Sequence, residues 1–227
     1  MAASVTELAL LTLASGPITP AQRSGLARAK EAMERFSGQP FTYLHFNERQ
    51  RFQGSDRQNA NAFQHILIVG GWPSIDFHKS NWIPSEENQV FVRELGNLGI
   101  GVRWMWHVGV SRGLVQERAF VYGWEGAVKI WRGAVPLAKV DQVAEILGIT
   151  REVMESGSSM RNDRDGVVAG WRLDEGFLAE GETEKSLRRE GETAEIVLLG
   201  DAGKETLEAV EADAIAWEFF DCKVLDV

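Results

Sequence analysis

The sequence has few of the residues from which disulfides, metal sites and phosphate-binding loops are built. Among its 227 residues a single cysteine, Cys222, allows no disulfide within the chain, and the four histidines do not follow the spacing of metal ligands. No glycine-rich phosphate loop follows a predicted strand. We therefore expect no metal ion, no cofactor and a reducing, cytoplasmic location.

Long hydrophobic runs and an excess of positive charge are also missing. The apolar stretch 8–14 is too short to cross a membrane, and Glu7 precedes it where a signal peptide would carry basic residues. The net charge of −9 argues against a nucleic-acid partner. What the chain does have is eight tryptophans. We expect some of them to line a pocket for a hydrophobic small molecule, with core packing as the alternative role.

The first half of the chain follows the order βαββαβ. Thr19 and Pro20 open a helix that should stop near 38–40, and Ser74 opens a second helical region that breaks at Pro84 and restarts towards Leu98. The strands are predicted at 5–13, 41–47, 65–71 and 102–110. Such a unit forms a four-stranded antiparallel sheet with both helices on one face.

The second half repeats this plan. Strands are predicted at 127–135, 167–173, 194–199 and 216–224, and helices at 137–147 and 204–212, while 150–165 and 174–192 are predicted as exposed loops. In the first half, 48–61 is predicted as a long loop that can fold over another part of the molecule. The segment 65–70 matches 195–200. We therefore predict an α+β protein with two ferredoxin-like halves, 1–112 and 113–227, which pack sheet to sheet as one α+β barrel within one chain.

Strand alternation selects the side chains that face the space between the two sheets. Two strand faces mix aromatic and polar residues, which is unusual for a face packed on helices. We assign these faces to the cavity, with the residues Tyr43, His45, Arg103, Met105 and His107. The opposite face of the last strand, with Val102, Trp104, Trp106 and Val108, is then assigned to the helices. The alternative is that the mixed faces meet solvent.

The segment 70–82 is the most distinctive part of the sequence. It places Trp72 at the end of a strand and puts His78 and Trp82 one helical turn apart, so that both can face the same space. A neutral imidazole there can take a proton from a phenol or an enol near pH 7. The alternative for a lone helical histidine is a packing role.

This segment resembles the antibiotic biosynthesis monooxygenase family of dimeric α+β barrels, especially its duplicated fungal members. The resemblance rests on a strand that ends in Trp72, on Ser74, which opens the next helix, and on His78 within that helix. It also rests on the break at 82–85 and on His107 in the closing strand. It covers residues 5–110, and 118–227 only through the repeated plan. Some members of this family oxidise aromatic polyketides with dioxygen and no cofactor, and relatives of the same fold cyclise, dehydrate or isomerise metabolites.

The resemblance implies a cofactor-independent enzyme of secondary metabolism that oxygenates a phenol or enol in a hydrophobic polyketide- or terpenoid-like molecule. In this hypothesis His78 or His107 deprotonates the substrate and Arg103 stabilises the oxyanion. The substrate would be held by Trp72, Trp82, Tyr43, His45 and Met105. A cyclase or isomerase, including a pericyclic one, and a non-catalytic binding protein are the alternatives. A homodimer is compatible with each of them.

Overall fold

The computed structural model describes residues 5–13, 17–47, 51–52, 64–109, 127–147, 168–173, 177–178, 192–200, 204–214, 216–225 and 227. The first half contains β1 (Val5–Leu13), α1 (Pro20–Ser37), β2 (Phe41–Asn47), β3 (Arg51–Phe52), β4 (Gln64–Trp72), α2 (Ile75–Phe77), the π-helical turn η1 (His78–Trp82), α3 (Glu86–Asn97) and β5 (Ile100–Val108). The second half contains β6 (Ala127–Pro136), the 3₁₀ turn η3 (Leu137–Lys139), α5 (Val140–Ile146), β7 (Val168–Trp171), β8 (Phe177–Leu178), β9 (Thr193–Leu199), α7 (Lys204–Asp213) and β10 (Ala216–Val224).

The two halves have the same strand order. In the first half the neighbours run β2–β4–β1–β5, and in the second they run β7–β9–β6–β10, with antiparallel pairing throughout. Both orders are those of a ferredoxin-like βαββαβ unit. The predicted fold class, with its internal repeat, is therefore confirmed.

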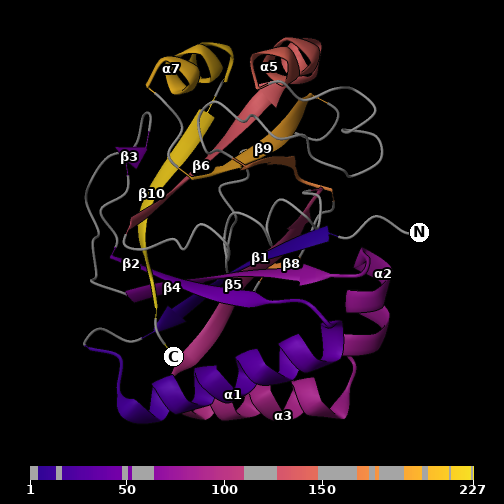
Figure 1. The fold of residues 1–227 in the computed structure, drawn as a ribbon, viewed down its shortest axis with the longest axis vertical. Helices are drawn as coiled ribbons and strands as arrows, with labels where there is room; N and C mark the ends of the chain where they lie inside the picture. Colours follow the sequence, from indigo (N-terminus) through magenta and orange to yellow (C-terminus); the bar gives the residue numbers. More distant parts are fainter. Residues whose placement is uncertain are drawn as a thin grey trace.

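The halves are joined through both edges of their sheets. On one side β10 pairs with β2 and with β3, and on the other side β5 pairs with β8 and bridges Arg172. β7 and β8, which stand at the two ends of the strand order, follow one another along the chain. The helices α1 and α3 cover one side of the resulting barrel, and α5 and α7 cover the opposite side (Figure 1). One chain therefore closes the barrel, as the repeat predicts.

Three apolar cores follow from strand alternation. Leu8 and Leu10 of β1 point between the two sheets, and Ala9 and Leu11 point towards α1. A third core lies under α5 and α7 and contains Trp131 and Trp171. The face of the sheet on which a side chain lies therefore decides which of these cores it joins.

The predicted helix signals are present, and two short strands were missed. Thr19 caps α1 through a reciprocal hydrogen-bond pair with Gln22, and Ser74 caps α2. β3 and β8 lie in segments that were predicted as loops, 48–61 and 174–192, while 150–165 and the boundary at 112/113 lie outside the described residues. No helix among the described residues is long and apolar enough to span a membrane.

Candidate functional site: a buried glutamate–histidine–histidine relay

The predicted assignment of strand faces is wrong for residues 104–108 of β5, whereas Val102 packs on the side of the helices as assigned. On β5 the side chains that point between the sheets are Trp104, Trp106 and Val108, whereas Met105 packs on the opposite side, against the core beneath the helices of the first half. Because successive side chains of a strand point to opposite faces, the sequence predicts which residues share a face. It does not predict which of the two faces meets the helices. Tyr43 and His107 were predicted to face the cavity between the sheets. Their polar atoms instead form hydrogen bonds beneath the helices of the first half.

The same inversion applies to β2. Tyr43 belongs to the core beneath α1, and its hydroxyl donates to the backbone oxygen of Leu26 at 3.2 Å. His45, two residues further along the strand, shares this face and is half-buried, so neither side chain faces the space between the sheets. Burial, followed by the charges of Glu7 and Glu34, raises the pKa of Tyr43, so its hydroxyl keeps the proton that it donates.

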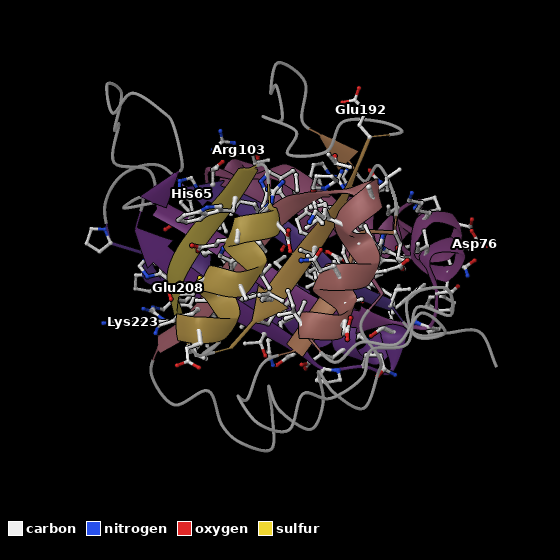
Figure 2. The ribbon with its side chains drawn as sticks, turned by 90° about the horizontal axis from the view of Figure 1, so that it is seen from above. His65, Asp76, Arg103, Glu192, Glu208 and Lys223 are labelled. Carbon is white, nitrogen blue, oxygen red and sulfur yellow. The ribbon has the colours of Figure 1, made fainter. Side chains whose placement is uncertain are left out.

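Arg103 does not join the predicted site. It lies at a β-bulge, because Leu10 pairs with Trp104 and the next residue of β1 pairs with Val102. Arg103 is roughly 13 Å along the strand from His107 at the usual rise per residue. Figure 2 shows Arg103 at the same end of the barrel as His65, with Asp76 on the opposite side.

Four of the predicted residues do meet, beneath the helices of the first half. His78 Nδ1 lies 2.8 Å from His107 Nε2, and the ring of Trp72 stacks on that of His78 with centroids 4.2 Å apart and planes 8° apart. Trp82 lies against the same indole, with ring centroids 5.8 Å apart. His78 and Trp82 therefore share one space, as their spacing predicts.

Glu7 completes this cluster and was not among the predicted site residues. Its Oε2 atom accepts a hydrogen bond from Trp72 Nε1 and lies 3.4 Å from His78 Nε2. Glu7 sits on β1 between β4 and β5, directly opposite Gly70 and His107. The signal was present in the sequence, because Glu7 is the only charged residue in the strand Val5–Leu13.

Local structure brings His78 to this point. Ser74 caps the helix start, and the chain then winds as a π-turn in which the amide of Ile83 donates to the carbonyl of His78. Single π-turns are rare and frequently occur at functional sites. The wider turn holds the imidazole of His78 between Glu7 and His107.

The cluster is closed to solvent. Glu7 is 3% exposed, His78 2% and His107 0%. A buried carboxylate requires hydrogen-bond donors, and the indole N–H of Trp72 supplies one. The nearby carboxylate favours a proton on Nε2 of His78, so Nδ1 of His78 accepts the proton of His107 Nε2. We call this chain of three groups the relay: Glu7, His78 and His107.

The second half has no counterpart of the relay, because all four histidines lie before residue 110. There, Trp131 donates to Glu211 at 3.2 Å, and Trp171 packs in the same core. Within the described ranges, no group of three or more His, Cys, Asp or Glu side chains is arranged to hold a metal ion.

Comparison with known proteins finds solved structures whose backbones follow a similar path. No family model matches the sequence. No curated protein matches it either. A candidate monooxygenase from Fusobacterium nucleatum aligns over 98% of this chain and 93% of its own, with a TM-score of 0.48 and 10% identity. A candidate monooxygenase from Lactobacillus acidophilus gives a TM-score of 0.44 at 11% identity over 99% of this chain and 100% of its own. A candidate chlorite dismutase gives 0.45 at 10% identity over 100% and 96%. The fold assignment itself rests on the strand order.

Proposed function

We propose that this chain is an enzyme that removes a proton from a small hydrophobic molecule through the relay. The observation that carries the proposal is the contact of 2.8 Å between the His78 and His107 rings, with the Glu7 carboxylate behind them. A buried carboxylate stabilises the imidazolium that forms when the terminal histidine takes up a proton. A general base of this kind contributes about 10²–10⁴-fold to a rate.

The three groups have different roles in this proposal. His107 has the role of the catalytic base, because it is the imidazole of the relay that lies further from the Glu7 carboxylate. His78 and Glu7 are positioning residues that act through it. Trp72 packs on His78, and Trp82 packs on Trp72. These aromatic side chains suit a substrate with a flat ring.

The reaction that we propose is cofactor-independent oxygenation of a phenol or enol, of the polyketide- or terpenoid-like kind found in secondary metabolism. Loss of a proton gives a substrate anion, which supplies the electrons that reduce dioxygen. In a ketone such as anthrone, the CH₂ group across the ring from the carbonyl becomes a second carbonyl. One oxygen atom enters the substrate, and the other leaves as water with the two hydrogens.

An isomerase or cyclase is the second candidate, and the arrangement of the two relay histidines in series favours it. Two imidazoles in series can accept a proton and return it to another atom of the same substrate. The product then has the mass of the substrate. The two reactions use the same residues and differ in whether dioxygen is consumed.

The test is incubation with enolisable aromatic ketones such as anthrone, under dioxygen and under argon, with products identified by mass. Oxygenation adds one oxygen and removes two hydrogens under dioxygen only, and isomerisation leaves the mass unchanged under both gases. His107→Gln keeps a donor for His78 but has no base, and it should lose turnover. Full turnover in this variant would overturn the proposal. Binding without turnover in the wild type would identify a non-catalytic binding protein.

A further inference from the structure

Trp72 contacts two members of the relay with two different parts of one side chain. Its indole N–H donates to Oε2 of Glu7, and its ring lies flat on the ring of His78, with centroids 4.2 Å apart and planes 8° apart. The oxygen that accepts from the indole is the same atom that lies 3.4 Å from His78 Nε2. One indole therefore holds the carboxylate with its edge and the imidazole with its face.

Strand pairing places this indole beside Glu7. On the helix-facing side of the sheet Trp72 pairs with Val5, and Gly70, two residues before Trp72, pairs with Glu7. Gly70 also pairs with Phe41 of β2, and a Cβ atom at Gly70 would overlap the ring of Phe41. The ring of Phe41 therefore covers Gly70, and it meets the indole of Trp72 edge to face, with centroids 5.4 Å apart. The glycine thus allows Phe41 to support the indole from the side of β2.

Further aromatic side chains enclose Trp72. The ring centroids of Trp82 and Phe77 lie 5.8 Å and 6.4 Å from that of Trp72. Trp72 itself is 0% exposed. A substrate would have to displace one of these neighbours to reach the indole. This enclosure favours a role of Trp72 towards the relay over direct contact with the reacting molecule.

We propose that Trp72 is the positioning residue of the relay. Its N–H fixes one oxygen of Glu7, and its ring face fixes the plane of the His78 imidazole. The contact of 2.8 Å between His78 and His107 depends on that plane, because a hydrogen bond weakens steeply as its angle departs from linearity. The geometric part of this proposal stands by itself, whereas its consequence for turnover rests on the proposed function.

The second half of the chain offers a matched control. Trp131 is 2% exposed, and its indole N–H donates to Glu211 Oε1 at 3.2 Å, so a strand tryptophan again binds a glutamate. No histidine belongs to that half, because all four lie before residue 110. Trp131→Phe therefore removes an indole–carboxylate hydrogen bond without touching a relay, and Trp72→Phe removes one within the relay.

The first experiment needs no substrate and follows the imidazole rings by nuclear magnetic resonance. In Trp72→Phe the ring signals of both His78 and His107 should move, while those of His45 and His65 stay in place. In Trp131→Phe all four sets of signals should stay in place. Signals of His107 that do not move in Trp72→Phe overturn the proposal.

The wild type provides a second measurement in case Trp72→Phe does not fold. The indole N–H of Trp72, identified by its magnetisation transfer to the His78 ring, should exchange slowly with solvent, because it is buried and bonded to Glu7. Fast exchange of this N–H, or no magnetisation transfer between the two rings, overturns the proposal.

The second experiment measures turnover of the best substrate from the ketone panel. Trp72→Phe should lower kcat by about tenfold or more with KM within about threefold, because positioning acts on the reacting state and not on substrate binding. Trp131→Phe should keep both constants. A raised KM at unchanged kcat would assign Trp72 to substrate binding instead and overturn the proposal.

A double variant shows whether Trp72 acts through the base. His107→Gln with Trp72→Phe should be no slower than His107→Gln alone, since residues that act as one unit have losses that do not add. Losses that multiply would show that Trp72 acts independently of the relay and would overturn the proposal. A wild type without turnover contradicts the proposed function only, and the resonance measurements then decide on Trp72.

Discussion

The two buried clusters lie on opposite faces of one sheet and differ in whether their charge can change. The relay consists of one carboxylate and two imidazoles, whose charge changes when a proton is gained or lost. The arginine cluster, Arg132, Arg172 and Glu195, consists of two guanidinium groups and one carboxylate, and guanidinium groups keep their protons. The first arrangement suits proton transfer, and the second forms fixed ion pairs.

The clusters also differ in what the fold must do to build them. Every member of the relay comes from the first half, from β1, η1 and β5. The arginine cluster takes Arg132 and Glu195 from β6 and β9 and lies against Trp106 of β5, so it forms only when the two halves pack together. A single strand, β5, contributes to both clusters through simple alternation.

The largest expected effect is on turnover. His107→Gln should reduce kcat for the oxidation of anthrone, or of the best substrate from the same panel, by about 10²–10⁴-fold, because the base is removed. The melting temperature, measured by circular dichroism, should change little. His65→Gln changes another buried histidine of the same sheet and should keep kcat within about threefold. Equal losses in both variants would show that the relay has no special role.

The next effect compares the two clusters by stability. Glu195→Leu leaves two buried guanidinium groups without their carboxylate and should cost about 3–5 kcal/mol in the free energy of unfolding. Glu7→Leu removes the acceptor of an indole and an imidazole N–H, which should cost about 1–3 kcal/mol. Urea unfolding at pH 7 measures both values. If Glu7→Leu lowers the free energy of unfolding as much as Glu195→Leu does, the relay carries a fixed positive charge. The two clusters then do not differ in whether their charge can change.

The fold was predictable because its signals are local. Alternation and turn residues located β10 at 216–224 to the residue, and the serine and threonine caps located the helix starts. β3 and β8 have no such signal, because each exists only through pairing with the last strand of the other half. Contacts of this kind are distant in sequence, so a single chain segment does not reveal them.

The candidate site was predictable only in part. The segment 70–82 brought Trp72, His78 and Trp82 together as expected, because their spacing lies within one strand end and one turn. Glu7 was missed, because its partners are 65 or more residues away and a strand rich in leucine predicts core packing. Tyr43 and His107 were assigned to the wrong face, because their partners on α1 and η1 are visible only in three dimensions.

A smaller effect concerns His65, a buried histidine outside both clusters. Burial, followed by the charges of Arg103 and His45, lowers the pKa of His65 from 6.5 to about 4. The unfolded chain therefore takes up a proton between these values while the folded chain does not. The stability from this group is fully present above about pH 6.5 and is lost as the pH falls to about 4.

Urea unfolding between pH 7 and pH 4.5 tests this linkage. The wild type should lose stability with falling pH more steeply than His65→Leu, by less than about 1.4 kcal/mol per pH unit, the limit for one proton. Arg103→Gln should make the loss less steep, since it removes one cause of the lowered pKa. Identical slopes in the wild type and His65→Leu would show that His65 is not the source of the acid sensitivity.

The smallest effect separates the relay from the packing around it. Tyr43→Phe removes a hydroxyl that donates to the carbonyl of Leu26 in α1, so it should lower the free energy of unfolding by about 0.5–1.5 kcal/mol. Turnover should be unchanged, because the ring stays in the core and the hydroxyl does not contact Glu7, His78 or His107 in any hydrogen bond of the described residues. Urea unfolding and kcat on the same preparation measure both quantities. A tenfold loss of kcat at unchanged stability would return Tyr43 to the substrate-binding role that the sequence predicts, and it would extend the site from the relay along β2.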